Sequence, residues 1–276
     1  MLKQRVLTAL VAGALVVAGV LWLPPLFILM LAGAAALAGG WEWTRLAGLR
    51  APQGRIAYLA LLILIGAAVW MGTATGLVPA FLGVAAAWWV GVAAWLVAGG
   101  GPRTEGRRPA LAWLAVGLLA LPALALGLGW LAQPGGPGRG VLLYVVCLVW
   151  AADIGAYFAG RAFGRHKLAP AVSAGKTWEG LAGGLGAVLV YALAGAWLLD
   201  VPPDSRLPWL SFSIAAGGLS VAGDLFESVL KREAGVKDSG AVLPGHGGVL
   251  DRIDSLIAAV PVLALGLEGL WLTGAG

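Results

Sequence analysis

Cysteine and histidine are scarce in this chain of 276 residues. Cys147 is the single cysteine and lies inside an apolar run, so the chain cannot form an internal disulfide. The two histidines, His166 and His246, are far apart in the sequence. With no cysteine pair and no paired histidines, a structural zinc site is not expected.

Charge is scarce as well, and apolar residues take its place. Charged residues make up 11% of the chain and hydrophobic residues 60%, with a mean hydropathy of +0.91. Apolar segments of roughly 20 residues, the length that spans a bilayer, recur along the chain. They are continuous and not alternating, which argues against an outer-membrane barrel. The sequence therefore predicts an all-α, polytopic integral membrane protein.

We expect about nine transmembrane helices, separated by turns such as Pro24-Pro25 and Pro202-Pro203. The first two spans could instead form a re-entrant hairpin, because the turn at Pro24-Pro25 is tight. No small-residue cleavage site precedes Pro24, so the first span is interpreted as an uncleaved helix. The predicted spans are residues 6–23, 26–41, 56–72, 77–98, 110–131, 140–160, 180–199, 208–230 and 253–272.

The positions of lysine and arginine predict the orientation. With the N-terminus in the cytoplasm, nine alternating spans place every Lys and Arg except Arg139 and Arg206 on the inner side. The net charge of +5 then lies on one face, where anionic lipid headgroups explain it without nucleic acid. We therefore expect a protein of the cytoplasmic (inner) membrane with its active site facing the cytoplasm.

The chain divides into two regions on this interpretation. Residues 1–135 would form about five N-terminal spans, and residues 136–276 a C-terminal catalytic region of about four spans. The catalytic region would carry two cytoplasmic loops, residues 161–179 and 231–252. Gly180 and Gly184 form a pair of small residues that would let two helices approach closely.

Asp153 lies at the cytoplasmic end of the sixth span. Asp153, Tyr157 and Arg161 are spaced at i, i+4 and i+8, which places them on one helical face. An acid within a span is costly, so it indicates a functional residue. The alternative is a structural ion pair between Asp153 and a neighbouring cation.

The loop of residues 161–179 combines small residues with Lys, Ser and Thr, which suits phosphate binding. Lys176 and Thr177 look like the end of a P-loop, but Pro170 stands where that motif needs glycine, and a membrane helix precedes it. We expect Thr177 to cap the next helix, whose free N–H groups could face an anion. Basic residues such as Lys167 could alternatively only anchor the loop at lipid headgroups.

Residues 223–255 are the most polar part of the chain. Carboxylates there could hold a divalent metal, while lysines and arginines could hold phosphates, a mixture that indicates metal-assisted phosphate chemistry. Asp254 could alternatively be a charge favoured by the dipole at a helix start. One helical face at the end of span eight carries Asp224, Glu227, Ser228 and Lys231, and another at the start of span nine carries Asp251, Asp254 and Ser255.

Three runs in this segment resemble the signature of the phosphatidate cytidylyltransferases (CDP-diacylglycerol synthases). The runs are Ser228-x-x-Lys231-Arg232, Lys237-Asp238-Ser239-Gly240 and Pro244-Gly245-His246-Gly247-Gly248-x-x-Asp251-Arg252-x-Asp254. Residues 153–164 and 176–180 are also similar to family segments, so the resemblance covers about residues 150–256. The family commonly has Ser-Pro-Lys-Lys-Thr-Trp-Glu-Gly where residues 173–180 read Ser-Ala-Gly-Lys-Thr-Trp-Glu-Gly, so one proline and one lysine are missing.

The resemblance implies transfer of the cytidylyl group of CTP to phosphatidate, giving CDP-diacylglycerol and pyrophosphate for phospholipid biosynthesis. The implied partners are CTP, phosphatidate and membrane lipid, and a homodimer is left open. The expected cofactor is Mg²⁺, with or without a second cation, held by Asp224 and Asp251. Catalytic roles are expected for Asp224, Asp251, Lys231 and Lys176. Substrate-binding roles are expected for Asp153, Lys167, Ser173, Thr177, Glu179, Glu227, Ser228, Arg232, Lys237, Asp238, His246, Arg252 and Asp254.

Two other functions are weighed against this one. A related cytidylyltransferase could act on another lipid phosphate, because the groove for acyl chains has no motif. A polytopic transporter would also carry buried acids, but near the midplane and often in paired repeats. A CDP-alcohol phosphotransferase is disfavoured, because the chain contains no Asp-Gly dipeptide.

Overall fold

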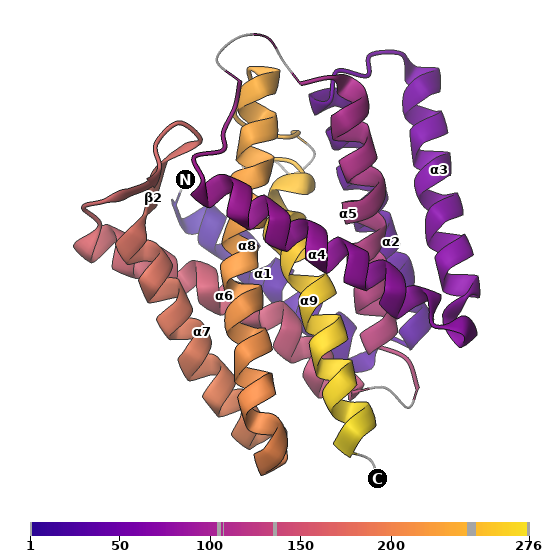
Figure 1. Ribbon diagram of the computed structural model, residues 1–276, viewed down its shortest axis with the longest axis vertical. Helices are drawn as coiled ribbons and strands as arrows, with labels where there is room; N and C mark the ends of the chain where they lie inside the picture. The colour runs from indigo at the N-terminus through magenta and orange to yellow at the C-terminus, as the bar shows by residue number, and fades with distance from the viewer. Residues whose placement is uncertain (1, 104–105, 107, 135–136, 242–246, 275–276) are drawn as a thin grey trace.

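The computed structural model describes residues 2–274, apart from 104–105, 107, 135–136 and 242–246. Within these ranges the chain forms nine α-helices of 20 residues or more, and each predicted span corresponds to one of them (Figure 1). The helices are α1 (Leu2–Trp22), α2 (Pro25–Leu46), α3 (Pro52–Met71), α4 (Leu77–Val97), α5 (Ala110–Leu131), α6 (Gly138–Phe163), α7 (Trp178–Leu198), α8 (Arg206–Ala234) and α9 (Leu250–Gly274).

Most of these helices have the length and composition of membrane spans. Seven, α2 to α8, are apolar and long enough to cross a bilayer, and α1 contributes a shorter apolar stretch, Gly13–Trp22. The protein is therefore a polytopic helical membrane protein, as predicted. Nine crossings and an inner N-terminus remain predictions.

Several helices continue beyond the apolar segments that predicted them. The span expected at 26–41 runs on to Leu46, and the span expected at 208–230 runs on to Ala234. Intrahelical hydrogen bonds do not require apolar side chains, so a helix continues until a residue stops it. Gly235 ends α8, because its φ of 72° is left-handed and favours glycine. The extra turns carry polar residues past the apolar zone.

A small β-hairpin departs from the all-α expectation. Strands β1 (Lys167–Ala169) and β2 (Ser173–Thr177) pair antiparallel in the loop between α6 and α7. The pairing supplies hydrogen bonds to backbone groups that no helix can satisfy. The hairpin projects from the ends of α6 and α7 in Figure 1.

Small residues allow α6 and α7 to lie close together. A Cβ at Gly184 would come within 2.9 Å of the Ala152 carbonyl oxygen, and one at Gly180 within 3.1 Å of the Ala156 carbonyl oxygen. The predicted close approach at Gly180 and Gly184 is therefore confirmed, and its partner helix is α6.

Helix α9 connects the two regions of the chain. It packs along α8 and also contacts α2, α4, α5 and α6. Phe226 of α8 adds a second connection, because its ring lies among Trp43 of α2, Trp89 and Trp95 of α4, and Trp113 of α5, with ring centroids 5.3–6.5 Å apart. The C-terminal helices are thus held by the N-terminal ones.

The basic loops gather at one end of the bundle. Figure 1 shows the first residues of α3 and α5, the hairpin and the last residues of α8 at the same upper end. These are segments that the charge pattern assigned to one side of the membrane. The fold thus brings the polar segments of the C-terminal region to a common surface.

Candidate active site

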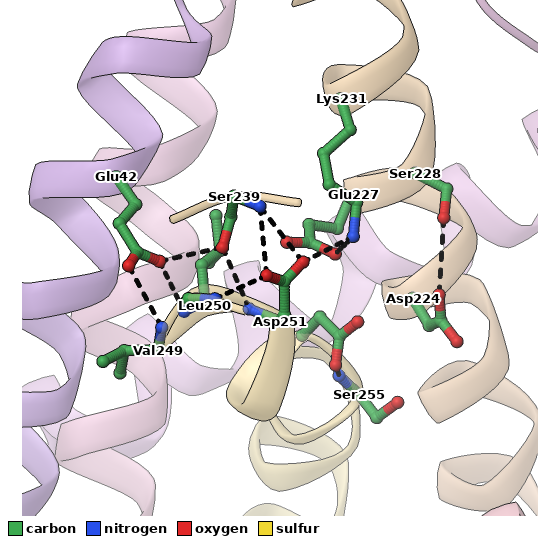
Figure 2. Close-up of polar contacts among 12 residues, drawn as sticks. Glu42, Asp224, Glu227, Ser228, Lys231, Ser239, Val249, Leu250, Asp251 and Ser255 are labelled. Atoms are coloured by element: carbon green, nitrogen blue, oxygen red, sulfur yellow. Dashed lines mark hydrogen bonds and ion pairs between the residues drawn. The ribbon is translucent and has the colours of Figure 1, made fainter. Parts of the chain in front are cut away.

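The acidic ends of α8 and α9 meet, as the sequence predicted. Gly223 makes this possible, because a Cβ there would lie 2.4 Å from the Asp254 carbonyl oxygen. Lys231 of α8 joins the two helices: its Nζ lies 2.7 Å from Asp251 Oδ1 and also binds the Glu227 carboxylate. Figure 2 shows Glu227 and Lys231 turned toward Asp251, with Asp224 one turn before Glu227 in α8.

Asp251 is firmly held by its surroundings. Its Oδ2 accepts hydrogen bonds from the backbone N–H groups of Gly248 at 2.8 Å and Ser239 at 3.0 Å, while Oδ1 receives Lys231. Burial alone would raise the pKa of Asp251, but the bonds from Lys231 and Gly248 stabilise the ionised form, and the pKa lies below its usual range. Asp251 is therefore a fixed carboxylate.

Asp224 has a more open environment. Its Oδ2 lies 2.7 Å from Lys176 Nζ, and its side chain is 33% exposed. Among the described residues, its Oδ1 has a single long contact of 3.5 Å, with the Ser228 hydroxyl. Because Lys176 belongs to β2, this ion pair also fastens the hairpin to α8. A hydrogen bond of 3.3 Å from Arg232 Nε to the Val172 carbonyl oxygen is a second tie between the hairpin and α8.

Glu227, which interacts with both aspartates, has a buried carboxylate oxygen that lacks a described hydrogen-bond partner. Glu227 is 2% exposed, and its Oε1 is buried with no hydrogen-bond partner among the residues described. It is near enough to both Asp224 and Asp251 to interact with them electrostatically, and Asp254 is an electrostatic neighbour of Asp224 and Glu227. A buried polar atom without a partner requires an explanation, and an oxygen set of this kind suits a hard cation.

The fit to Mg²⁺ is that of an incomplete site. In the part of the chain that the structure describes, no three His, Cys, Asp or Glu side chains are arranged as a ready-made metal site. Mg²⁺ is commonly held by one or two carboxylates, with waters and substrate phosphates completing its shell. The carboxylates present fit such a shared site.

Helix α6 adds a further acid to this group. Asp153 lies near enough to Asp224 and Lys176 to interact with them electrostatically. Arg161 donates a 2.8 Å hydrogen bond to the Tyr157 hydroxyl, which confirms that the predicted face of α6 exists. The three polar segments of the sequence therefore converge on one region.

Thr177 and Glu179 organise the start of α7. The Thr177 hydroxyl oxygen accepts a 3.1 Å hydrogen bond from the backbone N–H of Gly180, so the predicted helix cap is confirmed. Glu179 accepts hydrogen bonds from the backbone N–H of Arg165 at 3.1 Å and from His166, whose Nδ1 lies 2.6 Å from Oε1. Both side chains hold the loop in this structure.

The remaining predicted residues differ in their surroundings. Lys167 donates a 2.8 Å hydrogen bond to the Ala174 carbonyl oxygen, across the hairpin, and Ser173 is half-buried in β2. His246 lies outside the described residues. Exposed side chains at this end of the molecule are Lys167, Arg232, Lys237, Asp238 and Arg252.

Two buried glutamates of the site region were not predicted from the sequence. Glu42 of α2 binds Ser239 and the start of α9, and the sequence offered one signal for it, since it is the sole acid among residues 1–100. Glu233 of α8 accepts hydrogen bonds from the backbone N–H groups of Arg103 at 3.2 Å and Arg108 at 3.0 Å. No local pattern indicated these distant partners.

Comparison with known proteins places the chain in a family. The sequence matches the cytidylyltransferase family over residues 3–269. It is 42% identical to a phosphatidate cytidylyltransferase of Pseudomonas aeruginosa over all of this chain and 99% of the relative. Relatives with the same name occur in Haemophilus influenzae, 41% identical over 95% of this chain and 96% of the relative, and in Brucella suis, 36% identical over 96% and 92%. The chain belongs to the cytidylyltransferase family.

Proposed function

We propose that this protein transfers the cytidylyl group of CTP to phosphatidate, giving CDP-diacylglycerol and pyrophosphate. The observation that carries the proposal is that two carboxylate–lysine ion pairs lie together at one end of a membrane bundle. The pairs are Asp224–Lys176 and Asp251–Lys231. The names of relatives that match nearly the whole chain support the same reaction. Family membership and geometry thus point to one chemistry.

The reaction needs no strong general base. A phosphate oxygen of the lipid, already ionised, attacks the α-phosphorus of CTP while the bond between the α-phosphorus and the bridging oxygen breaks. Pyrophosphate leaves with that electron pair. The protein's task is to position two anions and to neutralise their charge.

We assign the divalent cation to the cluster of carboxylates and the phosphates of the substrates to the lysines and arginines. Asp224 and Asp251 would hold Mg²⁺, with Glu227 Oε1, which accepts no hydrogen bond from a described residue, beside them. When bound, Mg²⁺ would neutralise phosphate charge and stabilise the pyrophosphate leaving group. Asp153 and Asp254 lie nearby as further carboxyl groups.

Lys176 is best placed to exchange one partner for another. Its ammonium binds Asp224 at a partly exposed position, with 24% of the lysine side chain accessible. A phosphate oxygen arriving with a cation on Asp224 would replace that carboxylate as the partner of Lys176. The exposed cations Lys167, Arg232, Lys237 and Arg252 would bind other phosphate oxygens.

The location suits both substrates. CTP is soluble, whereas the phosphate of phosphatidate lies at the membrane interface, where the polar end of this bundle would also lie. We propose that this end faces the cytoplasm, because the charge pattern of the loops predicts it.

Labelled CTP tests the reaction. With purified protein, phosphatidate and Mg²⁺, label in the α-phosphate should move into the lipid fraction, while label in the γ-phosphate should appear as pyrophosphate. Replacing phosphatidate with other lipid phosphates tests the acceptor. Label uptake into sealed proteoliposomes without any labelled lipid would instead support a transporter.

A further inference from the structure

Glu42 lies in the N-terminal region, far in sequence from the site, yet it holds the site's backbone. Its Oε2 accepts hydrogen bonds of 2.8 Å from the Ser239 hydroxyl and 2.8 Å from the Leu250 N–H. Its Oε1 accepts a 3.1 Å bond from the Val249 N–H. Arg45, one turn farther along α2, donates to the Ser239 carbonyl oxygen. Figure 2 shows Glu42 and Asp251 on opposite sides of Ser239.

The surroundings of Glu42 are those of a fitted side chain. Glu42 is 4% exposed and Ser239 is fully buried. A Cβ at Gly240 would lie 2.1 Å from Glu42 Oε1, and one at Gly248 would lie 2.3 Å from Oε2. Only glycine leaves room for the carboxylate at these two positions. The carboxylate thus fits between two segments that flank residues 241–247.

The contacts lead directly to Asp251. Ser239 donates its N–H to Asp251 Oδ2, and its hydroxyl oxygen accepts the Asp251 N–H at 3.3 Å. Gly248, which packs on Glu42, donates the other N–H to Asp251 Oδ2. The two described backbone donors to Asp251 Oδ2, Ser239 and Gly248, are therefore both positioned against Glu42.

We propose that Glu42 and Arg45 form a clamp from α2 that positions Asp251, and through it Lys231, for cytidylyl transfer. We class them as positioning residues, since the contacts that they make in the described part of the chain are with Ser239 and the start of α9. The inference rests on the proposed function. It gives the N-terminal helices a role in the reaction as well as in crossing the membrane.

Glu42→Gln tests the clamp with little change in size. The amide keeps one acceptor oxygen, but its NH₂ group is a donor and cannot accept hydrogen bonds from the backbone N–H groups that it would face. We expect kcat to fall roughly tenfold or more, because small misplacements of reacting groups cost large factors in rate. Arg45→Gln, at an exposed position, should lower kcat in the same direction by a smaller factor, about threefold.

Two matched controls separate positioning from folding. Glu233→Gln also alters a buried glutamate that accepts hydrogen bonds from backbone N–H groups, but its partners are Arg103 and Arg108 of the loop before α5 and the Trp113 indole of α5. Arg139→Gln also removes an arginine that donates to backbone carbonyls of another helix, those of Val20 and Leu21. Both controls should lose thermal stability in detergent while kcat and the KM for CTP stay within about twofold of wild type.

The comparison is made on wild type and variants at equal folded concentration, with kcat, KM for CTP and Tm measured together. A loss of kcat in Glu42→Gln beyond that of Glu233→Gln at a similar loss of Tm supports the clamp. A wild-type kcat in folded Glu42→Gln would overturn the clamp. If Glu42→Gln does not fold, a wild-type kcat in Arg45→Gln would overturn it. Absence of turnover in the wild type would instead count against the proposed function itself.

Discussion

The two acid–lysine pairs of the site are built alike but held differently. Asp251–Lys231 is nearly buried, with side chains 10% and 13% exposed, and backbone N–H groups hold the carboxylate. Asp224–Lys176 is 33% and 24% exposed and joins α8 to a hairpin. The first pair is arranged by the protein in advance, whereas the second has room to change partners. A site that must bind and release a charged nucleotide needs both properties.

Removing Lys231 should have the largest effect. Lys231→Met leaves the buried carboxylates of Glu227 and Asp251 without their cation, which typically costs about 3–5 kcal/mol of stability. We expect a large fall in the thermal unfolding temperature and loss of turnover. A stable, active Lys231→Met protein would show that the inner pair is not structural.

Asp224→Asn should separate chemistry from stability. We expect turnover to fall about a hundredfold or more, because removing groups that stabilise transition-state charge has this scale. The unfolding temperature should change little, since Asp224 is partly exposed. Turnover and thermal unfolding are measured on the same preparation. A parallel loss of stability would mean that Asp224 resembles Asp251 after all.

Lys176→Gln should act mainly on nucleotide binding. The partly exposed ion pair contributes about 1 kcal/mol or less to stability, so folding should be nearly unchanged. The KM for CTP should rise, and its rise should be larger than that for phosphatidate. Unchanged KM values would leave Lys176 as a tether of the hairpin only.

Ser228→Ala should have the smallest effect. The contact from the Ser228 hydroxyl to Asp224 Oδ1 is 3.5 Å, at the limit of a hydrogen bond. Its loss should change stability by about 0.5 kcal/mol or less. A large loss of turnover with normal folding would show that Ser228 contacts substrate and does not serve Asp224.

The sequence predicted those parts of the site whose partners are near in the chain. Thr177 as a helix cap and the face carrying Glu227 and Lys231 follow from local spacing, and both are confirmed. The meeting of the ends of α8 and α9 could also be expected, since one loop joins two helices in succession.

Contacts between distant segments could not be predicted. Glu42 lies about 200 residues from Ser239 and Leu250, and its partners are mostly backbone groups that any sequence carries. The hairpin was missed because its two strands are too short to show a period of two. Such contacts are set by how the bundle packs.

Pyrophosphate release from CTP by purified protein in detergent, with phosphatidate and Mg²⁺, beside Asp224→Asn, tests the central claim most directly. We predict release that depends on lipid and Mg²⁺, is absent with ATP and is lost in the variant while the variant's fold persists. Release at the wild-type rate by folded Asp224→Asn would contradict it.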